Sequence, residues 1–172
     1  MVFWIPPASE PASGAVDTGL AVLMCPMGGP ALKDEILAFR RVGIDGVVSM
    51  LTPAEVADLG LSLEESIVRD AGMKYWSLPI FDHGVPDSIA ALAALVDDLR
   101  AEMRRGATIG AHCWAGIGRS CLLLSCLLCA EGATPAEAFS RLSRARGFDV
   151  PETREQRRWV ERFAAAYSEM PR

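Results

Sequence analysis

The residue types with the clearest chemistry lie in one stretch, residues 108–120, which reads TIGAHCWAGIGRS. A β-prone run there leads into a loop that carries Gly116 and Gly118, and then into a helical pattern. Glycines let a loop curl so that successive backbone N–H groups point inward, and a following helix adds its positive N-terminal end. This layout predicts an anion-binding cradle.

Cys113 and Arg119 bracket this loop, with five residues between them. The amides and the helix end that attract phosphate should also stabilise a thiolate. Arg119 can hold two phosphate oxygens in a planar fork, as lysine cannot. A lone cysteine at a strand end is more often a small buried side chain. The spacing from Arg119 and the two glycines favour a catalytic thiolate over that alternative.

The segment His112-Cys113-x5-Arg119-Ser120 resembles the signature of the cysteine-dependent protein-tyrosine and dual-specificity phosphatases. A bare Cys-x5-Arg also occurs in rhodanese-like proteins, arsenate reductases and low-molecular-weight phosphatases. The low-molecular-weight phosphatases have it near the N-terminus, whereas here it lies about two-thirds along the chain. The resemblance implies catalysis by Cys113 and Arg119. It also implies a phosphate-binding loop made of Trp114, Ala115, Gly116, Ile117, Gly118 and Arg119.

A second match lies upstream, where residues 78–87 read LPIFDHGVPD and resemble the general-acid loop of the small dual-specificity phosphatases. The resemblance implies that Asp82 is the general acid. Its distance from Cys113 along the chain fits two facing loops at the ends of two strands that follow one another along the chain, with one helix between them. Asp87 is a rival carboxylate, but it directly precedes a helical pattern and is expected to be that helix's N-cap. His83 is expected to be a surface residue of the loop.

A third match is residues 143–156, SRARGFDVPETREQ, which are similar to the Arg-x-Arg-Pro-Gly…Glu-Thr-x-x-Gln segment of the same phosphatases. The family's proline after the second arginine is absent here. The resemblance offers Gln156 as a residue that orients the attacking water, with a structural role as the alternative. Residues 43–61 are similar to the bacterial branch related to cyclin-dependent-kinase-inhibitor-associated phosphatase. Together the matches cover about residues 20–163.

Two neighbours of the signature have supporting roles in this interpretation. His112 precedes the loop and is expected to hydrogen-bond it and tune the thiolate, with direct base chemistry as the alternative. Ser120 is expected to hydrogen-bond Cys113 and ease its departure in the second step, or else to satisfy the first turn of the helix. Three further cysteines follow on that helix and are expected to pack in the core: Cys121, Cys126 and Cys129.

Composition excludes several classes of function. The 172-residue chain is 51% hydrophobic and 23% charged, with a formal net charge of −5, which argues against nucleic acid or an anionic membrane as a partner. No apolar run approaches the roughly 20 residues of a membrane helix. The start of the chain lacks a basic region and a long apolar segment, so a cytoplasmic location is expected. The five cysteines form neither a disulfide framework nor a paired metal motif, and no metal or other cofactor is expected.

Four β-prone runs, at residues 20–24, 46–50, 75–79 and 108–112, alternate with helical patterns. This alternation predicts an α/β fold with a central, mostly parallel sheet flanked by helices. The phosphatase resemblance specifies the dual-specificity subtype of that fold. Residues 1–172 are expected to form one domain, on which residues 1–19 pack as an N-terminal extension. Helix starts are expected at Thr52, with Glu55 as the capping-box acid, and at Ser62, Asp87-Ser88 and Thr134.

The sequence thus predicts a phosphomonoester hydrolase that works through a phosphocysteine intermediate. Its expected substrate is a phosphorylated protein or a small phosphomonoester, with phosphotyrosine favoured by the resemblance. A phosphoinositide or inositol phosphate phosphatase is an alternative, although the loop carries no lysine. A catalytically weak phosphate-binding module and a sulfur-transfer or arsenate-reducing enzyme are others. The intact trio of Cys113, Arg119 and Asp82 argues against the binding module, and Asp82 with its flanking prolines, Pro79 and Pro86, argues against the sulfur-transfer or arsenate-reducing enzyme. The sequence does not specify an oligomeric state.

Overall fold

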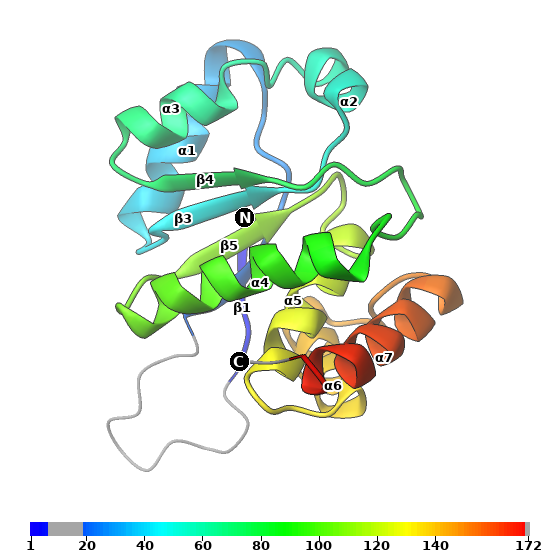
Figure 1. Cartoon of the computed structure of the whole chain (residues 1–172). Coiled ribbons are helices and arrows are strands. Elements are labelled where there is room, and N and C mark those ends of the chain that lie inside the picture. The colour runs from blue at the N-terminus through cyan, green and yellow to red at the C-terminus, as the bar shows by residue number, and fades with distance from the viewer. Residues whose placement is uncertain (7–18, 171–172) are drawn as a thin grey trace.

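The computed structural model describes residues 1–6 and 19–170, and a five-stranded sheet lies at its centre (Figure 1). The strands are β1 (Val2–Trp4), β2 (Leu20–Leu23), β3 (Gly46–Ser49), β4 (Lys74–Ser77) and β5 (Ile109–His112). Their order in space is β1-β2-β5-β3-β4. All neighbours pair in parallel except β1, which is antiparallel to β2 at one edge. The predicted mostly parallel sheet is confirmed.

Helices cover both faces of this sheet, as Figure 1 shows. One face carries α1 (Leu32–Arg41) and α3 (Glu64–Asp70). The other carries α4 (Ile89–Arg104), α5 (Arg119–Ala130), α6 (Pro135–Arg146) and α7 (Arg154–Ser168). A short 3-10 helix, η1 (Gly29–Ala31), and a short helix, α2 (Pro53–Asp58), complete the list. Within the described ranges, no helix is long and apolar enough to cross a membrane.

The three inner strands, β2, β5 and β3, are buried along their whole length because two cores form, one on each face of the sheet. Leu20 and Val22 of β2 belong to the core beneath α4 to α7, whereas Ala21 and Leu23 belong to the core beneath α1 and α3. All four residues are at most 1% exposed. Strands buried on both faces read as continuous apolar runs, which is why β2, β3 and β5 were visible in the sequence.

Helix capping follows the sequence at Thr52 and Thr134, where capping boxes close with Glu55 and Glu137. The prediction that Asp87 caps α4 is wrong. Ser88 is the N-cap, because its hydroxyl accepts the hydrogen bond from the Ala91 N–H at 3.3 Å. The helix therefore begins one residue later than an Asp87 cap requires.

The predicted helix start at Ser62 is also wrong. The N-cap position of α3 is Leu63, which provides no side-chain cap. Leu61 is fixed in the core at 1% exposure, and its carbonyl accepts the Glu64 N–H at 2.8 Å. A backbone turn thus takes the place of a serine cap.

The N-terminal extension lies only partly within the described residues. Residues 2–4 form β1 and pair with β2, and the Ile5 N–H donates to the carbonyl of Leu20 at 3.0 Å. Residues 7–18 lie outside the described ranges. That residues 1–172 form one domain with residues 1–19 packed on it stays a proposal.

Candidate active site

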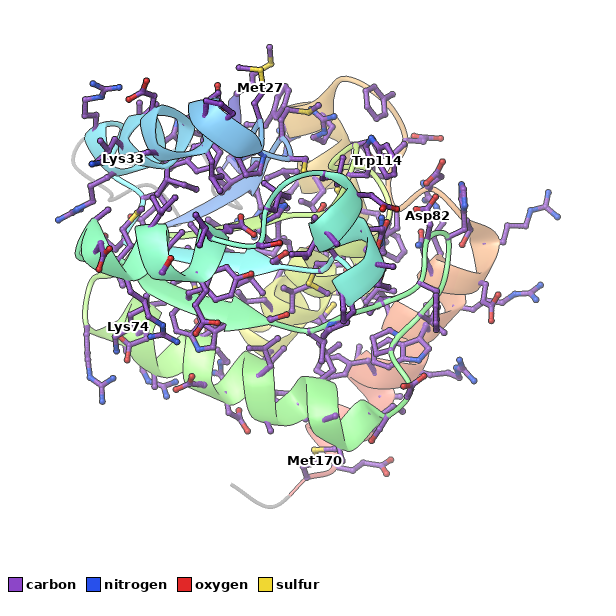
Figure 2. All side chains as sticks on the ribbon, turned by 90° about the horizontal axis from the view of Figure 1, so that it is seen from above. Met27, Lys33, Lys74, Asp82, Trp114 and Met170 are labelled. Atoms are coloured by element: carbon purple, nitrogen blue, oxygen red, sulfur yellow. The ribbon has the colours of Figure 1, made fainter. Side chains whose placement is uncertain are left out.

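The candidate site lies at the carboxyl end of the parallel strands, where the loops after β3, β4 and β5 meet. Ligands of open α/β sheets bind at this edge. Figure 2 shows Asp82 and Trp114 at one end of the molecule, away from Lys74 at the start of β4. A cavity of about 100 Å³ opens there. It is lined by Asp82, His83, Cys113, Trp114, Ala115, Ile117, Gly118, Arg119 and Glu152.

The loop between β5 and α5 is closely confined, and this explains its two glycines. Gly116 has a φ of +66°, and a Cβ there would lie 3.1 Å from the carbonyl oxygen of Leu23. A Cβ on Gly118 would lie 3.0 Å from Nε2 of Gln156. The loop therefore runs between the end of β2 and the start of α7, and a Cβ at either position would press on its neighbours.

Arg146, in the last turn of α6, holds the outer side of the same loop. Its Nε donates to the carbonyl of Gly116 at 2.8 Å, and its Nη2 donates to the carbonyl of Ala115 at 3.1 Å. Its guanidinium lies over the rings of Phe3 at 3.8 Å and Phe148 at 5.0 Å. Because Arg146 binds the loop's carbonyls, it helps to fix the peptide orientation of the predicted anion cradle. The sequence analysis included Arg146 only as part of residues 143–156, the segment that is similar to the phosphatases.

Cys113 is at the floor of the cavity and is 3% exposed. Its Sγ lies 3.5 Å from Oγ of Ser120, the contact expected from the sequence. His112 is fully buried, and its Nδ1 lies 3.3 Å from the carbonyl oxygen of Cys113. Its Nε2 lies 2.8 Å from Oε1 of Glu64, whose Oε2 accepts from the Tyr75 hydroxyl at 3.3 Å. The sequence analysis missed Glu64, which reads as an ordinary first-turn acid of a helix.

Arg119 is held in a two-pronged contact with Glu55. Nη1 donates to Oε2 at 2.8 Å and Nη2 donates to Oε1 at 2.9 Å. Nη1 also donates to the carbonyl of Ile80 at 2.9 Å. The side chain of Arg119 is 1% exposed. The sequence analysis identified Glu55 only as the capping-box acid of α2, and the structure shows that one carboxylate serves both the cap and the arginine.

These contacts change the acidity of Glu55. Burial by itself would raise its pKa, but the hydrogen bonds from Arg119 and Thr52 lower the pKa from 4.5 to about 2. Both Thr52 donors, the backbone N–H and the hydroxyl, reach Oε2 at 2.9 Å. Glu55 is therefore ionised throughout the neutral range, and its negative charge balances the positive charge of the Arg119 guanidinium.

Asp82 faces this pair from the loop after β4. Its Oδ1 lies 3.2 Å from Nη2 of Arg119, and its side chain is 57% exposed. The structure thus brings Asp82 to the cavity, which Asp87 does not line. His83 is exposed, as expected, and also lines the cavity beside Glu152.

Gln156 is fully buried at the start of α7. Its Nε2 donates to the carbonyl of Gly84 at 3.1 Å, and its Oε1 accepts from the backbone N–H of Thr153 at 3.2 Å. The amide therefore ties the Asp82 loop to α7 and closes the capping box of that helix. Its expected role in orienting water stays a prediction.

Comparison with known proteins finds a matching family model and several similar proteins. A family model described as cyclin-dependent kinase inhibitor 3 matches residues 30–138. Human cyclin-dependent kinase inhibitor 3 is 25% identical over 149 residues, which cover 81% of this chain and 70% of the human protein. Protein tyrosine phosphatase domain-containing protein 1 of Danio rerio is 28% identical over 134 residues, which cover 73% of this chain and 18% of that protein.

Solved structures share the fold. Kinase associated phosphatase, with serine in place of its catalytic cysteine, has a TM-score of 0.80 at 21% identity, covering 88% of this chain and 89% of that one. PTPMT1 has a TM-score of 0.74 at 20% identity, covering 88% and 93%.

The fold and the loop from Cys113 to Arg119 place the chain in the class of cysteine-dependent protein-tyrosine and dual-specificity phosphatases. The matching family model spans more than half of the chain. The chain belongs to the cyclin-dependent kinase inhibitor 3 family.

The low pKa of Glu55 makes stability depend on pH. A carboxylate whose pKa is lowered by folding stabilises the folded state above its ordinary pKa, here 4.5, and that contribution is lost as the pH falls toward about 2. We expect Glu55→Gln to lower the free energy of unfolding at pH 7 by about 1.5–3 kcal/mol, the range for hydrogen bonds to charged groups. The difference from the wild type should shrink between pH 5.5 and 3, measured by urea unfolding.

Glu65→Gln, at an exposed carboxylate of α3, is the matched control. It should change the unfolding free energy by less than about 0.5 kcal/mol at either pH. A difference between Glu55→Gln and the wild type that stays constant from pH 5.5 to pH 3 would contradict this account of the Glu55–Arg119 pair.

Proposed function

We propose that this protein hydrolyses phosphomonoesters on proteins in two steps through a phosphocysteine intermediate. The observation that carries the proposal is the buried guanidinium of Arg119. It is fixed by Glu55 at 2.8 and 2.9 Å, faces Asp82 at 3.2 Å, and lies in the same cavity as Cys113. A fixed cation, a thiol and an exposed carboxyl group around a glycine-rich loop suit phosphoryl transfer.

In the first step, the thiolate of Cys113 attacks phosphorus in line and forms an S–P bond. The bond from phosphorus to the leaving oxygen breaks, and Asp82 gives its proton to that oxygen. The backbone N–H groups of residues 114–119 bind the equatorial oxygens together with Nε of Arg119, a buried donor that has no hydrogen-bond partner within the described residues. Their positions are set before the substrate arrives, because Arg146 and Glu55 hold the loop and the guanidinium.

In the second step, water attacks the phosphocysteine. Asp82 accepts a proton from the water, the S–P bond breaks, and Cys113 leaves as a thiolate with inorganic phosphate as the product. The hydroxyl of Ser120, 3.5 Å from Sγ, is placed to donate to the departing sulfur. No metal or organic cofactor takes part in this scheme.

A phosphorylated protein is the proposed substrate class. The loop interior offers Ala115 and Ile117 and no cationic side chain other than Arg119, so it lacks additional charge for a polyphosphorylated headgroup. A phosphoinositide is the second candidate. Release of phosphate from a phosphotyrosine peptide, a phosphothreonine peptide and a phosphoinositide, measured side by side, tests the assignment. Turnover of the phosphoinositide alone would overturn it.

Replacing the nucleophile should separate binding from turnover. Because the cradle consists of backbone amides and Arg119, Cys113→Ser should abolish hydrolysis and retain binding of vanadate. Arg119→Lys should lose most of both, since a lysine has neither the Nε donor nor the two-pronged contact with Glu55. Steady-state kinetics and vanadate titration measure the two effects. Turnover by Cys113→Ser above the background rate would remove Cys113 from its role.

Replacing the acid should give a loss that depends on the leaving group. Asp82→Asn should slow the turnover of substrates with poor leaving groups by about 10²–10⁴-fold, because no proton reaches the departing oxygen. With p-nitrophenyl phosphate the loss should be much smaller, because that leaving group needs less protonation. Asp87→Asn is the matched control. If Asp87→Asn gave the larger loss, the assignment of the acid would be wrong.

The proposed thiolate should also make the protein sensitive to peroxide, because the thiolate is the form that peroxide oxidises. Burial raises the pKa of the other four cysteines, Cys25, Cys121, Cys126 and Cys129, so they stay thiols at neutral pH. Mild peroxide should therefore modify Cys113 first, and vanadate should protect it. Peptide mapping decides this, and first modification at another cysteine would contradict the proposal.

A further inference from the structure

His83 has an unusual backbone conformation. Its φ is +58°, and among residues 1–6 and 19–170 it is the one non-glycine residue with a positive φ. Residues with a Cβ are uncommon in this left-handed region, although histidine adopts it more often than most, and such positions gather at functional sites. His83 directly follows Asp82 and lines the same cavity.

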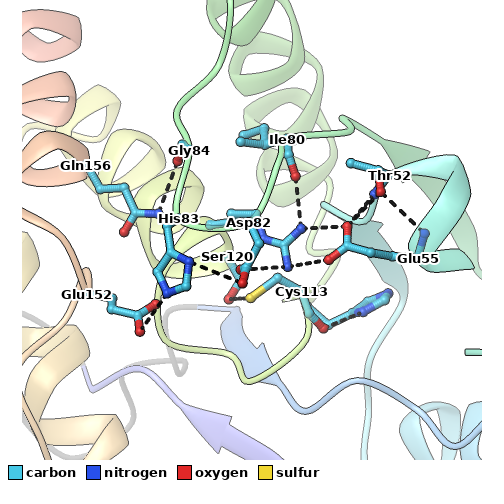
Figure 3. A network of polar contacts seen from close by, with 12 residues as sticks. Thr52, Glu55, Ile80, Asp82, His83, Gly84, Cys113, Ser120, Glu152 and Gln156 are labelled. Atoms are coloured by element: carbon cyan, nitrogen blue, oxygen red, sulfur yellow. Dashed lines mark hydrogen bonds and ion pairs between the residues drawn. The ribbon is translucent and has the colours of Figure 1, made fainter. Parts of the chain in front are cut away.

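The imidazole of His83 bridges two carboxylates, as Figure 3 shows. Nδ1 lies 3.2 Å from Oδ2 of Asp82, and Nε2 lies 3.4 Å from Oε1 of Glu152. A protonated imidazole can donate to both at once. Oδ1 of Asp82 is at the same time 3.2 Å from Arg119. Each oxygen of Asp82 thus has a partner, and each keeps a lone pair for the proton that the acid carries.

The turn around His83 is fixed at its other side by α7. The Gly84 N–H donates to the carbonyl of Phe81 at 2.8 Å, and the Gly84 carbonyl accepts from Gln156 at 3.1 Å. Gln156 lies in the first turn of α7, and Glu152 lies in the segment just before that helix. The loop that carries Asp82 is therefore tied to one element by two contacts, one to its backbone and one to the His83 side chain.

We propose that His83 is a positioning residue for the general acid, with Glu152 as its anchor. The imidazole and Arg119 hold the two oxygens of Asp82, so that the carboxyl group faces the leaving oxygen. The side chains of His83 and Asp82 are 62% and 57% exposed. Exposed ion pairs add little to the stability of a fold. The contribution of His83 therefore lies in the orientation of Asp82, to which general-acid catalysis is sensitive.

This inference rests on the proposed function. The first experiment tests the positioning role of His83 with the variant His83→Gly. Glycine accepts the left-handed backbone without strain and removes the imidazole. We expect kcat on a phosphotyrosine peptide to fall roughly 10-fold, a part of the roughly 10²–10⁴-fold that a general acid supplies. KM should stay within twofold of wild type and Tm should not fall. With p-nitrophenyl phosphate, kcat should change less than with the peptide.

Glu152→Gln tests the anchor, and Glu155→Gln, an exposed carboxylate in the first turn of α7, is the matched control. Glu152→Gln should lower kcat on the peptide in the same direction as His83→Gly, and Glu155→Gln should leave it unchanged. In an Asp82→Asn background, His83→Gly should cause no further loss, because the imidazole acts through Asp82.

A readout without turnover uses the two histidines of the chain, His83 and the fully buried His112. In NMR spectra of the imidazole groups, Glu152→Gln should shift the resonances of His83 and leave those of His112 in place. Resonances of His83 that do not respond would overturn the anchor contact.

The outcomes separate the two proposals. If the wild type hydrolyses no phosphomonoester, the proposed function fails, whatever the NMR spectra show. If the wild type is active and Asp82→Asn is slow, but His83→Gly keeps the wild-type kcat on the peptide, the positioning role alone is wrong. A further loss when His83→Gly is added to Asp82→Asn, or a fall in Tm that matches the loss of kcat, would also overturn it.

Discussion

The contact between Glu55 and Arg119 is the interaction on which the rest of the site depends. A guanidinium that is 1% exposed must be paired, because a buried charge without a partner is strongly unfavourable. Glu55 provides the pair and fixes the plane of the guanidinium by occupying both terminal nitrogens. The carbonyl of Ile80 adds a third contact from the segment before Asp82. The side chain of Arg119 thus joins α5, α2 and the loop that carries Asp82.

Two further contacts hold the loops that surround the cavity. Arg146 holds the phosphate loop from α6, and Gln156 holds the Asp82 loop from α7. Helices α6 and α7 pack on α5 in the core, so the residues that steady the two loops are set on rigid elements. Backbone amides and side chains that are positioned in advance need no reorganisation when charge develops on a bound phosphate.

Several parts of the site were predictable because they are local. The glycine-bearing loop between a strand and a helix, with Cys113 and Arg119 at its ends, is a continuous stretch of chain, and its chemistry follows from residue types and spacing. Helix starts were predicted where a threonine cap and an acid three residues later agree, at Thr52 and Thr134. The prediction failed at Ser62 and Asp87, where a backbone turn and a neighbouring serine provide the cap instead.

The sequence by itself determined the class of fold, and it pointed to the proposed nucleophile, its arginine and the loop of the proposed acid, since each of these lies in residues close along the chain. Only the tertiary structure decided which carboxylates complete the site. Glu55 and Glu64 read as ordinary acids of helix first turns, yet one pairs with Arg119 and the other with His112. The physical reason is that parallel strands bring their carboxyl ends to one edge, so residues from separate loops become neighbours. The chain has many acidic residues, and the fold places two of them, Glu55 and Glu64, beside the buried guanidinium of Arg119 and the buried imidazole of His112.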